Sequence, residues 1–451
     1  MSAFSEDSRV KFPTIKHLME MGYKYISQNG LESKRYSLDK TNIDPDTNIL
    51  IDYLRVAYFK LNENKTEDDF NKLLGKIQST LNNEDLGREF YETILLDTDN
   101  KIVDLSSPDN FRTRNTFQVA TELTCGKKDS DNFRPDITLF VNGLPLAFIE
   151  VKKENNKDGV QAEFQRMERR FVVPAFRRYL NITQIMVFSN DMNYEDEGAV
   201  PTQGAFYGAI GRKTSKYSTF REEGQNSSFP LKVYKTEVSA DIEEAMLRDN
   251  NVVQYKNFSE YQTNCNINTP TKSICDSLFS YERFHFFLKY GIAYANYTSG
   301  LQKHLMRYPQ LFATKAIEQY IDKGNDKGII WHTQGSGKTA LAYYNVKYLT
   351  DYYSKQGIIP QFFFIVDRLD LMEQAKMEFT CRGLKVVPVQ TKDDFTKIIS
   401  SPLTTQNQSG ALEITVVNIQ KFSQDSKALA KNAYNLKDRK STRLNSSHRC
   451  I

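Results

Sequence analysis

The seven residues from Thr333 to Thr339 have the types and spacing that bind a nucleotide's phosphates. They form the run Thr-Gln-Gly-Ser-Gly-Lys-Thr between an apolar, strand-like stretch at 328–332 and a helix-like one at 340–344. Glycines let backbone N–H groups turn toward an anion, the lysine supplies a charge for the β- and γ-phosphates, and the last threonine can ligate Mg²⁺. His332 replaces the glycine with which the general pattern begins. The predicted binding residues are Thr333, Gln334, Gly335, Ser336, Gly337, Lys338 and Thr339.

A second group of residues that could do chemistry lies at 135–152. Asp136 opens a strand-like stretch, Asn142-Gly143 marks a turn, and the returning apolar stretch carries Glu150 and Lys152. Alternation along a strand puts Glu150 and Lys152 on one face, and a hairpin at the turn returns the chain to Asp136. Two carboxylates and a lysine can bind Mg²⁺ and orient or deprotonate a water that attacks a phosphodiester. We predict a metal-dependent nuclease with Asp136 and Glu150 as ligands, against the alternative of a charged, solvated hairpin edge.

Basic residues are densest just after this hairpin. Arg166, Arg170 and Arg177 would share one face of an ideal helix, although we expect Pro174 to interrupt it. One interpretation is contact with a DNA backbone, for which Arg166, Arg170, Arg177 and Arg178 are the candidates. The other is a solvated face neutralised by Glu163 and Glu168, and the sequence does not decide between them.

Composition sets broad limits on the class of protein. The 451 residues allow two or three domains, and 60 basic against 56 acidic residues give a net charge of only +4. The five cysteines form no CxxC pair, so a disulfide framework and a zinc site are not expected. We find no signal segment and no stretch long and apolar enough for a membrane span, and we expect a cytoplasmic protein without membrane contact.

Four regions follow from the patterning along the chain. Residues 1–235 begin with helical periodicity and continue with strand alternation from about 101, which predicts one α/β domain around the hairpin. Residues 236–300 are rich in Phe and Tyr, and their pattern predicts a helical connector. Residues 301–437 alternate strands and helices, as a parallel sheet with crossovers does. Residues 438–451 resemble the translation of a sequencing-library adapter, and we expect them to be a non-native tail.

The segment from Arg134 to Lys152 resembles the nuclease core of the restriction (R) subunit of type I restriction–modification enzymes. Later segments resemble that family's motor motifs in its order: Arg307–Gln310 its glutamine motif, Trp331–Thr339 its motif I, and Phe364–Leu371 its motif Ia. The resemblance implies a PD-(D/E)xK restriction-nuclease-like domain followed by the first RecA-like, parallel-sheet domain of a superfamily 2 motor. It also implies adenine contact by Gln310, a catalytic role for Gln165, and a DNA contact by Arg368.

The same resemblance implies cofactors and partners. ATP and Mg²⁺ would drive translocation of double-stranded DNA coupled to endonucleolytic cleavage, with methylation (M) and specificity (S) subunits as partners in host defence. The chain departs from the family in having Arg169 where a tyrosine often follows Gln165, and no Asp-Glu-x-His box follows Gln420. We therefore expect the motor to continue beyond residue 437. Other nuclease–helicase fusions, type III-like or in repair, remain alternatives, as does a fragment that binds ATP and DNA without hydrolysis.

Overall fold

The computed structural model describes residues 5–27, 43–125, 133–153, 160–194, 202–209, 211, 217–333, 335–389, 391–400 and 412–418. The predicted tail at 438–451 and Gln334 lie outside these residues. The chain divides into two compact units, one formed by 1–221, 231–292 and 302–305, and the other by 222–230, 293–301 and 306–451. Each unit is described by itself.

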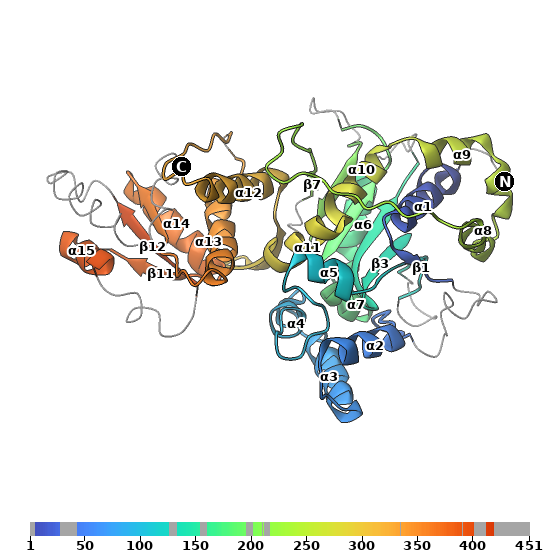
Figure 1. Ribbon diagram of the computed structural model, residues 1–451, viewed down its shortest axis with the longest axis horizontal. Coiled ribbons are helices and arrows are strands. Elements are labelled where there is room, and N and C mark those ends of the chain that lie inside the picture. The colour runs from blue at the N-terminus through green and yellow to red at the C-terminus, as the bar shows by residue number, and fades with distance from the viewer. Residues whose placement is uncertain are drawn as a thin grey trace. The chain divides into compact units, whose positions relative to one another are not determined.

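A seven-stranded mixed sheet forms the centre of the first unit (Figure 1). Its strands lie in chain order and are β1 (Lys24–Tyr25), β2 (Phe117–Thr121), β3 (Ile137–Val141), β4 (Leu144–Val151), β5 (Ile185–Ser189), β6 (Ala205–Gly208) and β7 (Ser218–Thr219). The pairs β1–β2 and β4–β5 are parallel and the other four are antiparallel. Strands β2 to β5 are buried along their whole length, because helices cover both faces of the sheet.

The turn between β3 and β4 has the geometry that its sequence predicts. Asn142 and Gly143 both adopt positive φ, 53° and 80°, as a two-residue type I′ hairpin turn requires. The buried Asn142 side chain donates to the Ile102 carbonyl and accepts from the Thr116 amide, at 2.8 Å in each case. The turn is thereby tied to the chain that precedes β2, which fixes the hairpin's register.

Opposite faces of this sheet carry different helices. On one face, Phe148 of β4 packs near Tyr179 of α7 (Arg177–Ile182), and Phe188 of β5 packs edge-on against Phe164 of α6 (Gln161–Arg170). On the other, Phe117 of β2 packs against Tyr281 of α11 (Tyr281–Tyr290). The break between α6 and α7 falls at Pro174, which opens the 3₁₀ turn η4 (Pro174–Phe176), so the predicted interruption is confirmed.

The N-terminal hundred residues are mainly helical, as predicted. They contain a π-helical turn η1 (Asp7–Lys11), α1 (Phe12–Glu20), α2 (Ile51–Leu61), α3 (Glu67–Thr80), α4 (Arg88–Phe90) and a second π-helical turn η3 (Tyr91–Leu95), followed by α5 (Pro108–Arg114). Helix α3 begins at a capping box, in which the Thr66 side chain accepts from the Asp69 amide and the Asp69 side chain accepts from the Thr66 amide.

The segment expected to connect two domains is helical but packs with the first unit as far as Ile292. It contains α8 (Ala240–Asp249), η5 (Val253–Asn257), α9 (Ser259–Asn266), α10 (Pro270–Phe279) and α11. Many of its apolar side chains are buried, and α10 is joined to the turn after α1, where Tyr23 Oη donates to the Phe279 carbonyl at 2.9 Å. Strands β8 (Ile292–Tyr297) and β9 (Gly300–Leu305) then form a separate two-stranded sheet.

The second unit contains a three-stranded, wholly parallel sheet in the order β10–β12–β11. Its elements are α12 (Tyr308–Asp322), α13 (Lys338–Ser354), β10 (Phe363–Val366), α14 (Leu369–Cys381), β11 (Lys385–Pro388), α15 (Lys392–Ser400) and β12 (Glu413–Asn418). This alternation agrees with the predicted α/β class. No helix in the described ranges is both long and apolar enough to cross a bilayer.

One predicted element is wrong. The apolar stretch 328–332 was expected to be a strand leading into the glycine loop, but it pairs with no described strand. Ile329 is 76% exposed and Trp331 90% exposed. An apolar run becomes a strand only if its backbone N–H and C=O groups pair with a neighbouring strand, and the described strands β10, β11 and β12 pair only with one another.

Candidate nuclease and nucleotide-binding sites

The β3–β4 hairpin brings the predicted carboxylates together. Ile137 pairs with Ile149, so Asp136, just before β3, lies opposite Glu150. The Val151 amide donates to Asp136 Oδ2 at 2.9 Å, which holds that side chain against β4. The predicted juxtaposition of Asp136 and Glu150 is therefore confirmed as geometry, and their catalytic role stays a prediction.

Glu150 is an acid in an environment that opposes its charge. Its side chain is only 4% exposed. Burial raises the pKa of Glu150 well above its ordinary value, and the neighbouring Asp136 carboxylate raises it further, while Arg170 acts in the opposite direction. The Arg170 Nη1 atom lies 3.4 Å from Glu150 Oε1. A second cation at this position would relieve the crowding of negative charge.

Lys152 lies among carboxylates from three separate elements. Its Nζ atom is 3.7 Å from Oε1 of both Glu6 and Glu163, and donates to the Val151 carbonyl at 2.8 Å. Burial alone would lower the pKa of Lys152, but the surrounding carboxylates, with Asp136 and Glu6 the strongest, together outweigh burial and raise the pKa. A lysine that keeps its proton suits orientation of a water and charge stabilisation better than removal of a proton.

Two acids near Lys152 were not predicted as site residues. Glu6 lies far away in sequence, and no spacing rule could have found it. Burial raises the pKa of Glu6, Lys152 opposes that effect, and Asp136 adds to it. The sequence predicted Glu163 only as an ion-pair partner of arginines. It forms such a pair, because its Oε1 atom lies 3.2 Å from Arg166 Nη1. Helical spacing from Arg166 and Arg170 was the signal that could have placed Glu163 on the site's side of α6.

Gln165 does not meet these carboxylates. It is exposed on α6, and two residues along a helix turn the side chain by about 200° from Glu163, which is buried. Glu163 is therefore the residue of this turn that reaches Lys152. The structure gives Gln165 no contact with Asp136 or Glu150, and its catalytic role stays a prediction.

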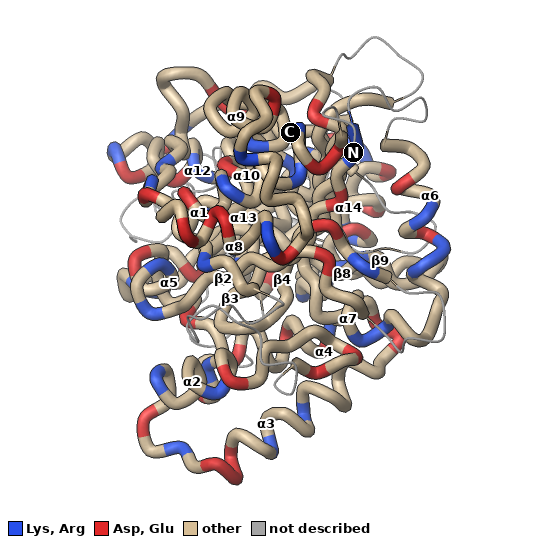
Figure 2. Tube along the Cα trace, turned by 90° about the vertical axis from the view of Figure 1, so that its right-hand side faces the viewer, with Lys and Arg blue, Asp and Glu red and all other residues tan. Residues whose placement is uncertain are grey.

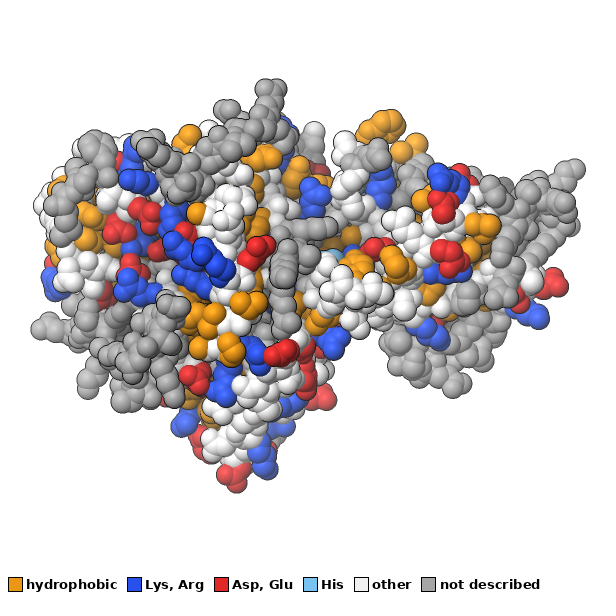
Figure 3. Space-filling view, turned by 180° about the vertical axis from the view of Figure 1, so that it is seen from behind, with side chains coloured by type: hydrophobic (Ala, Val, Ile, Leu, Met, Phe, Trp, Pro, Cys, Tyr) orange, Lys and Arg blue, Asp and Glu red, His pale blue; other side chains and the backbone are white. Residues whose placement is uncertain are grey.

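The candidate DNA-contacting arginines occupy different environments. Arg166 is half exposed, and Arg170 is turned inward to Glu150. Arg177 pairs with Glu84 at 2.5 Å and Arg178 with Asp46 at 2.9 Å, so both tie α7 to the helical N-terminal part. Basic segments recur along α6 in Figure 2, and Figure 3 shows basic side chains interleaved with acidic ones. Arg166 is the candidate best placed to meet a phosphate.

The carboxylates fit a hard divalent cation. The Oε2 atom of Glu163 is buried without a hydrogen-bond partner, and Glu150 and Asp136 crowd their charges together. Among the described residues no set of three or more His, Cys, Asp or Glu side chains is grouped as a complete metal cage. Mg²⁺ needs none, because it is commonly bound by one or two carboxylates together with water and substrate phosphate.

The glycine loop of the second unit has the backbone geometry of a phosphate-binding turn. Gly335 and Gly337 adopt φ of 79° and 86°, and α13 begins directly afterwards at Lys338. The positive φ of Gly337 strains any residue with a Cβ, and a Cβ there would also displace the Gln310 side-chain amide, whose Nε2 atom would lie 2.4 Å away. Helix α13 therefore directs its free N–H groups toward the loop, where an anion is stabilised.

The remaining predicted nucleotide ligands surround this loop. Gln310 accepts from the Arg307 amide at 3.0 Å and donates to the Gly337 carbonyl at 3.2 Å, so its amide supports the loop. Lys338 Nζ donates to the Thr333 carbonyl at 3.4 Å. The Ser336 Oγ atom is buried without a partner, and Thr339 follows Lys338 in the first turn of α13. These groups fit a triphosphate with its Mg²⁺ at Thr339. Arg368 is exposed and bonded to Asp370 at 3.0 Å.

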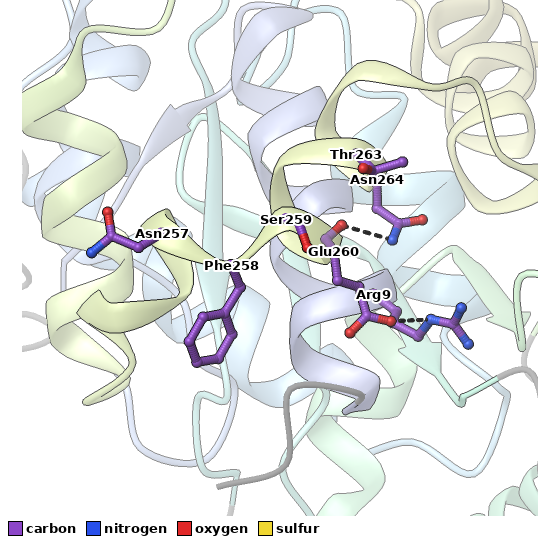
Figure 4. A pocket seen from close by; sticks show the side chains of 7 residues that line it. All are labelled: Arg9, Asn257, Phe258, Ser259, Glu260, Thr263 and Asn264. Carbon is purple, nitrogen blue, oxygen red and sulfur yellow. Dashed lines mark hydrogen bonds and ion pairs between the residues drawn. The ribbon is translucent and has the colours of Figure 1, made fainter.

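A separate hollow of about 500 Å³ lies between η1 and α9 (Figure 4). Its charged residues face each other: Arg9 Nε lies 2.5 Å from Glu260 Oε1. The other lining residues are neutral, namely Asn257, Phe258, Ser259, Thr263 and Asn264. Since none of the predicted site residues lines it, this hollow is distinct from both candidate sites.

Comparison with known families matches both parts of the chain. Residues 3–195 match the family described as the type I restriction enzyme R protein N terminus. Residues 303–447 match the family described as the type III restriction enzyme, res subunit. The first match contains the hairpin carboxylates and Lys152, and the second contains the glycine loop. The two matches, over much longer segments than the motifs, support a nuclease part followed by a helicase-type part.

Individual relatives carry the same description. The chain is 27% identical over 286 residues to a type I restriction enzyme endonuclease subunit of Methanocaldococcus jannaschii, covering 61% of this chain and 22% of that protein. A second such subunit of that organism is 25% identical over 397 residues, covering 82% and 34%. One from Staphylococcus aureus is 24% identical over 332 residues, covering 73% and 28%.

These matches first indicate a class, the restriction endonuclease subunits that combine a nuclease part with a helicase-type part. More particularly, the chain is similar to the N-terminal part of type I R subunits, the family that its motifs resemble. It spans 22% to 34% of the length of these relatives.

Proposed function

We propose that this chain supplies the endonuclease centre and the ATP-binding part of the motor of a type I restriction enzyme. The observation that carries the nuclease assignment is the hairpin register, which places Asp136 opposite Glu150 and leaves Lys152 two residues further along. Asp136 and Glu150 would hold Mg²⁺, which when bound would polarise a phosphodiester and lower the pKa of an attacking water.

The chain's own residues prepare that reaction. Glu6 and Glu163 hold the Lys152 ammonium between them, so that its charge lies beside the carboxylates. Arg166 offers a half-exposed guanidinium for the DNA backbone, and the apolar cores under β4 and α6 limit the water around Glu150. These contacts orient a phosphate and a water without any change in the fold.

The glycine loop supports ATP as the nucleotide that the motor hydrolyses. We propose that Lys338 contacts the phosphates, Thr339 holds the nucleotide's Mg²⁺, and Gln310 positions the loop beside the adenine. In the assembled enzyme, hydrolysis would drive translocation of double-stranded DNA with methylation and specificity subunits as partners. A type III-like fusion is the rival, because residues 303–447 match a type III family. Relatives named as type I extend over 82% of the chain, which favours type I.

Substitution of the hairpin residues tests the nuclease assignment. Asp136→Asn, Glu150→Gln and Lys152→Ala in the complete R subunit, assembled with its partners, should each lower the rate of DNA cleavage by about 100-fold or more. Lys153→Ala is the matched control, since it removes the same charge from the next, exposed residue. Cleavage at the wild-type rate by Glu150→Gln would place the nuclease elsewhere.

A further inference from the structure

Glu150 has a cationic partner within the chain, and that partner is not the lysine of the motif. The Arg170 guanidinium makes the ion pair, with Nη1 at 3.4 Å from Glu150 Oε1. Lys152 instead pairs with Glu6 and Glu163. Arg170 therefore bonds to an oxygen of the carboxylate that we assign to the metal.

The position of Arg170 does not depend on that ion pair alone. Its guanidinium carbon lies 4.2 Å from the centroid of the Phe133 ring, and its Nη1 atom lies 3.5 Å from Met167 Sδ. A charge-assisted N–H···O bond is usually about 2.7–2.9 Å long, so the contact with Glu150 is loose. The guanidinium packs on an aromatic ring, which keeps it near the carboxylate without a short hydrogen bond between them.

We propose that Arg170 is a counter-ion that competes with the divalent metal for Glu150, keeping metal affinity low until DNA draws the guanidinium away. The inference rests on the proposed function, because it takes Asp136 and Glu150 as the metal's ligands. Only 17% of the Arg170 side chain is exposed. Its aliphatic part is therefore packed, while its guanidinium can reach the edge of the proposed metal site.

Simple electrostatics gives the direction of this coupling. A divalent ion on Glu150 would repel a guanidinium within a few ångströms, and both must share one buried carboxylate. A DNA phosphate offers the guanidinium an alternative anion with matching geometry. Because coupling between two ligands is reciprocal, DNA that engages Arg170 raises affinity for the metal, and the metal raises affinity for DNA.

Metal binding by the 451-residue chain tests the proposal without any cleavage assay. Free Mn²⁺ is measured by electron paramagnetic resonance during titration of wild type, Arg170→Gln, Arg170→Met and Arg169→Gln. Both Arg170 variants should bind Mn²⁺ at least three-fold more tightly than wild type. Arg169→Gln is the matched control: it removes the same charge from the adjacent, exposed residue and should bind as wild type does. Unchanged or weaker binding by a folded Arg170 variant overturns the proposal, as does an equal gain from Arg169→Gln.

Two further measurements keep the result interpretable. Glu150→Gln should lose the Mn²⁺ site. If this variant binds Mn²⁺ as wild type does, the proposed metal site itself is wrong. If it loses Mn²⁺ binding but the Arg170 variants bind as wild type does, only the inference about Arg170 is wrong. A crystal structure of Mn²⁺-loaded wild type needs no variant to fold. It should show Arg170 Nη1 more than 4 Å from Glu150, and a metal on Glu150 with Arg170 still in contact would contradict the competition.

Discussion

Glu150 illustrates how one residue can be costly for folding and useful for function. Its carboxylate is buried beside Asp136, and both the burial and that neighbour raise its pKa. A charge that the fold tolerates poorly is a charge that a metal ion can stabilise. Glu163 is a second buried acid near this position, and its Oε2 atom has no hydrogen-bond partner.

The raised pKa predicts how stability depends on pH at this residue. Below the ordinary carboxyl pKa, Glu150 is protonated in both the folded and unfolded states and has no effect. As pH rises above that value, the unfolded chain loses the proton first, so the free energy of unfolding falls. Glu150→Gln should therefore raise the free energy of unfolding at pH 7 when no metal is bound, because the substitution removes a buried group that loses its proton more readily in the unfolded chain.

Thermal unfolding in a chelator at pH 4 and pH 7 measures this effect. The gain from Glu150→Gln should shrink at the lower pH, where wild type is also neutral at this position. Glu168→Gln makes the same substitution on α6 as a control. A gain that is equal at both pH values would mean that packing, rather than charge, explains the change.

At the scale of elements, the β3–β4 hairpin decides whether the site exists. A slip of one residue in its register would turn Glu150 to the opposite face of the sheet. The type I′ turn prevents this slip. The Asn142 side chain is hydrogen-bonded to the backbone of Ile102 and Thr116, and the Gly143 carbonyl accepts from the Leu50 amide at 2.9 Å. The turn and α2 are thus joined directly.

Gly143→Ala should disrupt that arrangement. Gly143 has φ of 80°, and an added Cβ would lie 2.5 Å from the Leu50 carbonyl oxygen. We expect a loss of about 2–3 kcal/mol in the free energy of unfolding, with Mn²⁺ binding weakened in parallel. Denaturant unfolding and metal titration measure the two effects.

Gly75 provides the contrasting substitution. It is an exposed position within α3, and a Cβ there meets no atom within 4 Å. Gly75→Ala should stabilise the protein by about 0.5–1 kcal/mol, because alanine favours helix and restricts the unfolded chain. Equal effects from the two glycines would contradict the role assigned to the turn.

At the scale of the whole molecule, the two candidate sites belong to separate compact units. The hairpin lies in the first unit, and the glycine loop and α13 lie in the second. Units with their own cores can lose a ligand site independently, so binding of the metal at the hairpin and of the nucleotide at the loop should be separable by mutation.

Lys338→Ala tests this separation in the chain itself. The loss of a charged contact with phosphate should weaken ATP binding by about 10-fold or more, while Mn²⁺ binding at the hairpin stays at the wild-type level. Calorimetric titration with each ligand measures both affinities, and Lys355→Ala at the end of α13 is the control. In the assembled enzyme the same change should abolish ATP hydrolysis. Wild-type ATP affinity in Lys338→Ala would remove the loop from the proposed motor.

Local sequence determined much of this protein. Asn142-Gly143 required positive φ, which selected a type I′ turn, and the alternation around it placed Asp136 and Glu150 in register. Pro174 ended a helix because it has no N–H to donate. The glycines at 335 and 337 likewise follow from backbone sterics. Each of these inferences depends on residues close together in the chain.

Tertiary structure decided what depends on distant segments. Glu6 reaches Lys152 only because η1 folds against the hairpin, and Glu163, rather than Gln165, faces the site because of how α6 lies on the sheet. Residues 328–332 had the composition of a strand but found no ladder partner among the described residues. Arg170 had the charge expected of a DNA contact, yet packing on Phe133 turned it toward Glu150. Composition and spacing fix local conformation, whereas the partner of each charge is chosen by the packing of segments that the chain brings together from far apart.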